Sequence, residues 1–275
     1  MTSVSRVPDE EDKLRLGGMA LRNGLLVHGP THWAAAVRTG DGSLKVASGR
    51  KPELAARARA PGVRGVAKLA EALAVIPLVK RALPEARLPM QDGRTLGAMA
   101  AAALAGQAVR RGGARTVGRE AAVAGIGLLP AVLSLRSGDL AAYHGVEHKA
   151  IAGYEQDEDA GDAGKEHDRC GSNLVAPLLT STVAGSVAAR RAGLRGPLAD
   201  ALVGLGSVAF AVEVFGWAER NSETSLARAL RRPGFEIQRL VGTREPDERQ
   251  LEVGRAALAE ILRVEEPASP ARSPG

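Results

Sequence analysis

The chain has 275 residues, of which 45% are apolar, so it is long enough to bury a sizeable core in one large domain or two small ones. Its net charge is +6, but aromatic residues make up only 3% and do not alternate with a basic stripe. This argues against nucleic acid, because single strands are usually held on aromatic platforms. A single cysteine, Cys170, excludes an intramolecular disulfide, and we expect no cleaved signal peptide.

Composition divides the chain into five successive regions. We expect a disordered leader at 1–16, a β-hairpin and helix region at 17–94, a membrane helical region at 95–218 with a metal-site loop at 136–172, a C-terminal helical region at 219–263, and a disordered tail at 264–275. The predicted fold is mixed α+β and mostly α, with a small N-terminal β-hairpin region beside an Ala/Gly-rich helical bundle.

The first region contains one clear hairpin signal. The turn sequence "TGDGS" is flanked by "HWAAAVRT" and "SLKVASG", which are rich in β-compatible residues. From Pro61 to Leu83 apolar residues recur at spacings of three and four, which predicts a helix. We expect Pro77 and Pro84 to break or kink that helix.

Four segments are apolar enough to be considered as membrane-spanning helices: 95–109, 117–135, 173–189 and 196–217. A spanning helix needs about 20 predominantly apolar residues, so the last segment is comfortably long and the first is short. Their many alanines and glycines suit close packing of membrane helices. An alanine-rich soluble protein would have the same composition, so hydropathy alone leaves both a membrane bundle and a soluble bundle open.

The stretch "YHGVEHKAIAGYE" carries the most specific chemical signal. His144 and His148 stand four residues apart, which places both imidazoles on one face of a helix, and Glu147 lies beside them. The pattern H-x-x-E-H is the inverted zinc-protease signature, in which two histidines bind zinc and the glutamate activates a water molecule. The motif is short, however, and a solvated helix face is the alternative interpretation.

A second stretch, "HDRCGSN", places His167 and Cys170 at H-x-x-C spacing. Three of the five histidines and the only cysteine therefore fall within 27 residues. Neutral imidazole and thiolate are preferred ligands of zinc and related transition ions, so we predict a zinc-type site at His144, His148, His167 and Cys170. For Cys170 the alternative is a small buried apolar residue, and for His167 a loop residue in an acidic linker.

The number of ligands separates two versions of this site. If all the candidate residues bind the ion, the sphere is closed and the ion is structural; if one is absent, water takes its position and Glu147 can act as general base. Glu213 lies in the apolar run "VAFAVEVFGWAE", where an acid is costly unless it is paired or coordinating. It is either a further ligand or the partner of an arginine.

The C-terminal region predicts a helix that docks on the hairpin or the bundle. Pro246 suits the first turn, Asp247 and Glu248 complement the N-terminal dipole, and an apolar face follows. The residues of that face are Leu251, Leu258, Ile261 and Leu262. Ahead of the helix, Phe235, Ile237 and Leu240 form a short amphipathic piece that fits either core packing or the membrane interface.

The chain resembles the DUF1385 family of bacterial proteins. The resemblance rests on "GGMALRNGLLVHGPTHWAAAVRTGDG", "YHGVEHKAIAGYE", "HDRCGSNLV" and "PGFEIQRLVGTREPDERQLEVGRAAL", which occur in the family's order between Gly17 and Leu262. It implies a multi-pass protein of the bacterial cytoplasmic membrane, with a metal site at His144, His148 and Cys170 and nearby acids at Glu147 and Glu155. It implies no known reaction or substrate.

One part of the resemblance is imperfect. The family's first stretch has a glutamine, an acid and an arginine where this chain has Met19, Asn23 and His28. If those polar groups contribute to a site, this member has lost or altered activity.

The leading hypothesis is an integral membrane protein that carries out metal-dependent hydrolysis, with membrane lipids as its surroundings. The main alternative is a membrane scaffold or partner-binding protein with a structural metal, and a weaker one is a soluble helical protein without metal. Substrate and protein partners do not follow from the sequence.

Overall fold

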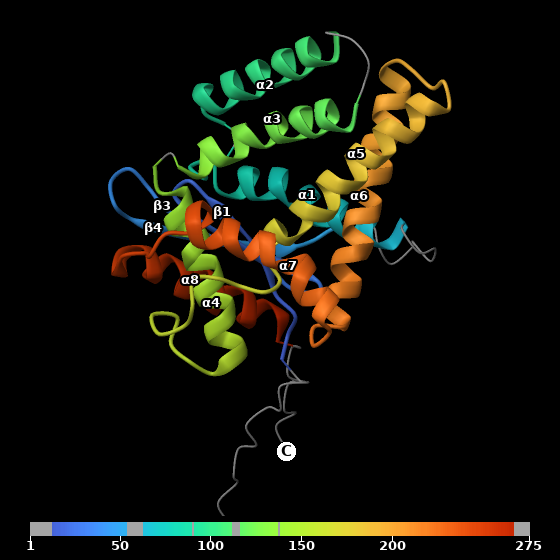
Figure 1. Ribbon diagram of the computed structural model, residues 1–275. Helices are drawn as coiled ribbons and strands as arrows, with labels where there is room; N and C mark the ends of the chain where they lie inside the picture. The colour runs from blue at the N-terminus through green and yellow to red at the C-terminus, as the bar shows by residue number, and fades with distance from the viewer. Residues whose placement is uncertain (1–12, 54–62, 90, 112–115, 137, 267–275) are drawn as a thin grey trace, which may run out of the picture.

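The computed structural model describes residues 13–53, 63–89, 91–111, 116–136 and 138–266. Most of the predicted leader, most of the predicted tail and the start of the predicted helix at Pro61 lie outside the described residues. The described chain is mixed α+β and mostly α, as predicted, with an N-terminal antiparallel sheet and a set of long apolar helices. Figure 1 shows the sheet packed among helices while two helix pairs project from it.

The sheet has four strands in the order β1-β2-β3-β4. Their bounds are β1 Gly17–Leu21, β2 Gly24–His28, β3 His32–Arg38 and β4 Leu44–Arg50. The predicted hairpin is confirmed as β3 and β4, which pair from His32 with Arg50 to Arg38 with Leu44. The sheet is larger than that hairpin, because the preceding segment "GGMALRNGLLVH" forms a second one through the tight turn at Arg22 and Asn23.

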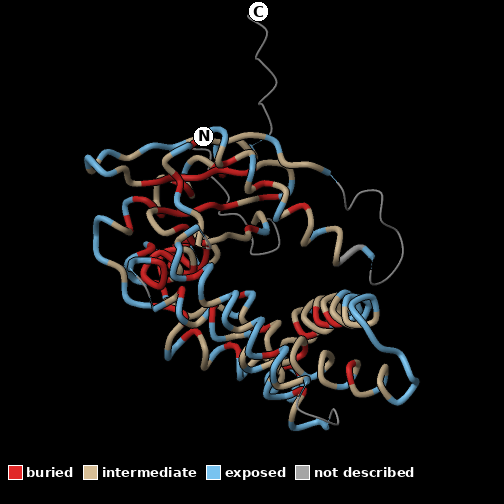
Figure 2. The backbone as a smooth tube through the Cα atoms, turned by 90° about the horizontal axis from the view of Figure 1, so that it is seen from above, coloured by how far each residue is buried: buried red, intermediate tan, exposed pale blue. Residues whose placement is uncertain are grey.

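Strand β3 is buried on both faces, so the sheet is covered by helices on both sides. Trp33, Ala35 and Val37 belong to the core cluster on the side of α1 (Val63–Ala82). Ala34 and Ala36 belong to the cluster formed with α4 (Leu140–Gln156) and α8 (Glu248–Glu265). Figure 2 shows the buried residues concentrated in this part of the chain. The small side chains of the β3 alanines allow helices to approach the sheet closely from both faces.

The two prolines of the α1 region differ in their effect. Pro77 lies inside the helix, which continues past it, and the helix ends at Ala82, shortly before Pro84. Val75 and Val79 on either side of the proline are fully buried against the sheet. Packing against the sheet therefore compensates for the hydrogen bond that the proline removes.

Helix α8 docks on the sheet and on α4, as predicted. Its N-cap is Asp247, which forms a capping box with Gln250, so Pro246 precedes the helix instead of occupying its first turn. At the other end, the Glu265 carboxylate accepts hydrogen bonds from the Thr31 and His32 amides and from the Thr31 hydroxyl. Both ends of the helix are thus fixed by polar contacts.

The two projecting pairs are antiparallel. They consist of α2 (Gly93–Arg111) with α3 (Val117–Leu135), and of α5 (Val175–Arg191) with α6 (Pro197–Arg220). Among the described residues, three helices are long and apolar enough to cross a membrane: 117–135, 171–191 and 197–220. The alanine-rich α2 forms a helix where the first apolar segment was predicted but does not meet this criterion.

The apolar helices expose most of their surface. At most 17% of each candidate span is buried, and Leu129, Leu133, Leu202, Leu205 and Phe210 are more than half exposed. Exposed apolar surface of this extent marks a contact with a membrane or a partner. Three helices of the described chain are therefore candidates to cross a membrane, and the sheet region stands at one end of them.

The chain returns to the sheet through α7 (Ser225–Ile237) and the π-helical turn η4 (Gln238–Gly242). Phe235 and Leu240 are exposed, whereas Gln238 is completely buried.

The contact between α4 and α8 gives a first prediction. A Cβ atom on Gly254 would lie 2.4 Å from Val146 Cγ1, so Gly254→Ala should lower the free energy of unfolding by about 1–3 kcal/mol through overpacking. The loss would appear as an earlier midpoint in denaturant titration of the detergent-solubilised protein. Gly97→Ala is the matched control, because nothing lies within 4 Å of its added Cβ. Equal midpoints for the two variants would contradict the close contact.

Candidate metal centre

Helix α4 presents the paired histidines inside the protein. The ring centroids of His144 and His148 are 4.4 Å apart, and His148 is only 2% exposed. Most of the helix is buried, from Leu140 to Gly153. The alternative of a solvated helix face is therefore wrong for this turn.

The loop after α4 brings Cys170 to the same place. Its Sγ atom lies 3.3 Å from His144 Nε2, and the Ser172 amide donates to it at 3.5 Å. Cys170 is the N-cap of the short 3-10 helix η3 (Gly171–Leu174), which leads into α5. Ligand atoms of His144, His148 and Cys170 all lie within 4.8 Å of one another, so this group could hold a metal ion.

Hydrogen bonds fix the orientation of both imidazoles. His144 Nδ1 lies 2.8 Å from the Gly242 carbonyl oxygen, and His148 Nδ1 lies 2.6 Å from that of Lys165. A carbonyl only accepts, so each ring carries its hydrogen on Nδ1 and presents the lone pair of Nε2 to the centre. Metal-binding histidines are held by the same kind of contact.

The Nε2 atom of His148 has no hydrogen-bond partner although it is buried. Buried polar atoms are rarely left unpaired, so this nitrogen calls for an explanation such as an ion. Burial lowers the pKa of His148 to about 3, which keeps the ring neutral and able to coordinate. Burial also raises the pKa of the Cys170 thiol to about 11, so metal binding would have to displace its proton.

The turn η4 holds two parts of the centre at once. Its last residue, Gly242, supplies the carbonyl for His144. Its first residue, Gln238, accepts from the His167 amide at 2.8 Å and donates to the His167 carbonyl at 3.2 Å and to Ser172 Oγ at 2.9 Å. Sequence reasoning missed both residues. The sequence around them, "FEIQRLVG", gives no signal for either role, because the burial of Gln238 and the π-helical turn, a feature often found at functional sites, are seen only in the structure.

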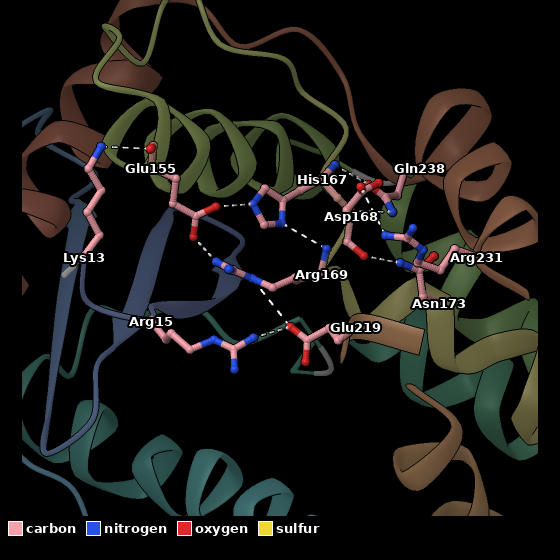
Figure 3. A network of polar contacts seen from close by, with 10 residues as sticks. All are labelled: Lys13, Arg15, Glu155, His167, Asp168, Arg169, Asn173, Glu219, Arg231 and Gln238. Atoms are coloured by element: carbon pink, nitrogen blue, oxygen red, sulfur yellow. Dashed lines mark hydrogen bonds and ion pairs between the residues drawn. The ribbon is translucent and has the colours of Figure 1, made fainter. Parts of the chain in front are cut away.

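His167 lies beside the group rather than within it. Figure 3 shows its ring between Glu155 and the backbone of Arg169. Its Nε2 atom is 3.2 Å from Glu155 Oε2, and its Nδ1 atom accepts from the Arg169 amide at 3.2 Å. The ring centroid is 5.8 Å from that of His148. With both nitrogens engaged, a role as ligand stays a prediction.

Glu155 and its neighbours join distant parts of the chain. The Glu155 carboxylate pairs with Arg169, whose Nε lies 3.8 Å from Glu219 Oε1 on α6, and Glu219 pairs with Arg15 at 3.1 Å. This network, drawn in Figure 3, links the cysteine loop to the end of a candidate membrane helix. Glu155 therefore contacts His167 and Arg169 and is not one of the three potential ligands. Glu213, the other candidate acid, lies on α6 outside the group of potential ligands.

Glu147 faces the same space from the other side. The Ala20 amide on β1 donates to its carboxylate, and burial raises its pKa. Gly18 makes the close approach of β1 possible, because a Cβ there would lie 2.8 Å from Glu147 Cγ. A carboxyl group with a raised pKa holds a proton more readily than an ordinary glutamate and suits general acid–base chemistry.

A cavity of about 340 Å³ opens onto the centre. His144, Glu147 and Cys170 line it together with Met19, one of the residues that depart from the family pattern. Its volume lies in the range of small-molecule sites, about 300–1,000 Å³. Asn23, another departure, instead donates to the carbonyls of Arg38 and Glu85, so its contacts are structural.

Comparison with known proteins finds a match to one family model. Residues 138–264 match the model of a family described as "Protein of unknown function (DUF1385)". The matched region contains His144, His148 and Cys170 and extends through most of α8, but it leaves out the sheet. Neither a curated protein nor a solved structure matches the chain.

The geometry predicts which residues hold a metal. His148→Ala and Cys170→Ala should each abolish stoichiometric binding of supplied zinc, because each removes one of three converging ligands. His167→Ala should retain the metal, since its nitrogens are bonded elsewhere. Elemental analysis of the detergent-purified proteins measures this directly. Loss of zinc from the His167 variant alone would assign the site differently.

Proposed function

From the premise that the chain belongs to the DUF1385 family, we propose that it is a membrane-embedded, metal-dependent hydrolase. A zinc-type ion would be held by His144, His148 and Cys170, with Glu147 as general base. The observation that carries the proposal is the orphaned Nε2 atom of buried His148, which faces a second imidazole and a thiol.

The number of converging side chains supports a catalytic site. Structural zinc sites have four protein ligands, whereas catalytic ones have three and keep a position open. Three groups converge here, and His167 is occupied by Glu155 and Arg169. When bound, a divalent ion of this kind polarises a carbonyl group and lowers the pKa of water.

The chain supplies the proton transfers through Glu147. Its carboxylate can accept a proton from water and pass it to a leaving group, which suits a carboxyl whose pKa is raised by burial. The Ala20 amide fixes the carboxylate, and the bonds to Gly242 and Lys165 keep both imidazoles from rotating. These contacts hold the reactive groups in place before a substrate arrives.

The apolar helices support a location in the cell membrane with several crossings. Three helices are long enough for this, and their exposed leucines would otherwise face water. The sheet and the candidate centre would then lie at the membrane surface, next to the ends of 117–135 and 171–191.

The contact between Glu147 and Ala20 supports a second candidate function, that of a scaffold without catalysis. The bond between Glu147 and the Ala20 amide satisfies an amide of edge strand β1, so the carboxylate could serve the fold alone. The ion would then be structural, and the protein would be a membrane scaffold or partner-binding protein whose metal pins the loop 157–170.

Substitution of the candidate general base, Glu147, distinguishes a hydrolase from a scaffold. Glu147→Gln should keep its zinc and its fold but lose about 10²–10⁴-fold in turnover, because the amide cannot accept the proton. Hydrolysis of fluorogenic esters, amides and phosphoesters by metal-loaded protein measures this. Glu158→Gln is the control, since Glu158 is exposed just after α4. Equal turnover by both variants, or none by the parent protein, would favour the scaffold.

The membrane location has its own test. After an alkaline carbonate wash, the protein should stay in the membrane pellet, because its candidate spans would expose large apolar surface in water. Immunoblotting of pellet and supernatant measures the distribution. Release into the supernatant without detergent would contradict an integral location.

A further inference from the structure

We propose that the substrate is a lipid ester whose hydrocarbon chain lies along α3 while its ester group lies at the candidate metal centre. This inference rests on the proposed hydrolase function and names its substrate class. It comes from the cavity that joins the centre to a candidate membrane helix.

The cavity is lined both by the reactive groups and by the end of α3. His144, Glu147 and Cys170 line it, as do Pro130, Ala131, Ser134 and Leu135 of α3, and the other lining residues come from β1, α4, η3 and the segment around Pro89 and Thr95. A ligand that fills this space must carry a polar, hydrolysable group next to a hydrocarbon portion. A lipid has this arrangement of polar and apolar parts.

The apolar wall belongs to a helix that faces lipid. Segment 117–135 meets the criteria for crossing a membrane, and Leu129 and Leu133 on either side of Ala131 are exposed. A hydrocarbon chain can therefore enter beside α3 from the bilayer without passing through water. The reactive groups lie just beyond the helix end, where the head of a lipid would be.

A second cavity extends the space along the helix. It measures about 830 Å³, is lined by α2, α3 and the start of α6 (Gly196, Pro197 and Asp200), and shares Pro130 and Ala131 with the first as lining residues. It continues to Arg110 and Arg111 at the far end of α2. Helix α3 has 19 residues, and at about 1.5 Å per residue it runs about 28 Å, close to the thickness of the hydrocarbon core. In the proposed complex an extended chain passes from one cavity to the other at Pro130 and Ala131.

The lining favours a neutral head group. The described residues around the first cavity include no lysine or arginine. Phosphate groups are usually bound by such side chains, so a carboxylic ester fits the site better than a phosphoester.

A peptide fits less well. Peptides bound in extended form pair with the free edge of a strand. Edge strand β1 borders the cavity, but its Ala20 amide already donates to Glu147. The structure thus favours an acyl chain over a polypeptide.

The reaction balances with water as the only co-reactant. The oxygen of water bonds to the carbonyl carbon, and the bond from that carbon to the alcohol oxygen breaks. The proton that Glu147 accepts from water goes to the departing alcohol oxygen. The products are a long-chain carboxylic acid and an alcohol.

The test uses photo-crosslinking in lipid nanodiscs. A long-chain acyl ester carrying a diazirine near the end of its chain should label the α2 and α3 segments around Ala131, mapped by peptide mass spectrometry. Metal-free protein and Glu147→Gln should be labelled as well, because labelling needs no turnover. Ala131→Phe, which fills the shared wall of the two cavities, should reduce labelling about tenfold, the loss expected from excluding about two methylene groups.

Ala122→Phe is the matched control, since Ala122 is another exposed alanine of α3 and is not among the residues lining the described cavities. Its labelling should equal that of the parent protein, and retained zinc would show that both variants fold. Equal labelling of the two phenylalanine variants, or label spread over all exposed helices, would overturn the proposal.

Further outcomes separate this inference from the hydrolase function. Labelling at Ala131 without hydrolysis of any ester supports the lipid ligand and overturns only hydrolysis. Hydrolysis of short soluble esters without labelling overturns only the lipid assignment. Labelling by a diazirine peptide in place of the acyl probe would identify a peptide substrate and overturn the lipid assignment.

Discussion

The rest of the structure depends on the close packing of α4. This helix packs against β1, against the loop before α8 and against α8 itself. At each of these contacts a glycine lets backbone or side chain approach where a Cβ would collide: Gly18 with Glu147, Gly145 with the Arg244 carbonyl, and Gly254 with Val146. Interiors packed at this density do not tolerate added atoms. Because α4 carries both imidazoles and Glu147, any shift of this helix would move all three reactive groups together.

Burial of α4 creates the second constraint, the satisfaction of polar groups away from water. The carbonyls of Gly242 and Lys165 satisfy one nitrogen of each histidine, and Gln238 satisfies the backbone of the cysteine loop. Among the potential ligand atoms of the described residues, His148 Nε2 is buried without a hydrogen-bond partner. Burial of an unpaired polar atom costs free energy, and this cost is removed if an ion binds between His148, His144 and Cys170. Metal binding and folding of the loop would then stabilise each other.

The position of the centre relates the sheet to the apolar helices. The sheet supplies a rigid wall with the Ala20 amide, while α3 supplies an apolar wall that reaches into the region expected to contact lipid. A site between these two layers has access to reactive polar groups on one side and to hydrocarbon on the other. The polar network of Glu155, Arg169, Glu219 and Arg15 ties the same loop to α6, so the centre is held by both layers.

Local pattern alone determined several parts of this protein. The turn "TGDGS" specified the β3–β4 hairpin, apolar content specified the long helices, and four-residue spacing placed His144 and His148 on one face, because each depends on neighbours within a few residues. Only the tertiary structure decided how the centre is completed. Gly242 is 98 residues from His144, and Gln238 is 71 residues from His167, so no local pattern could identify these contacts. Likewise, α1 continues through Pro77 because packing against the sheet overrides a local preference, and His167 turns to Glu155 because the loop folds back on α4.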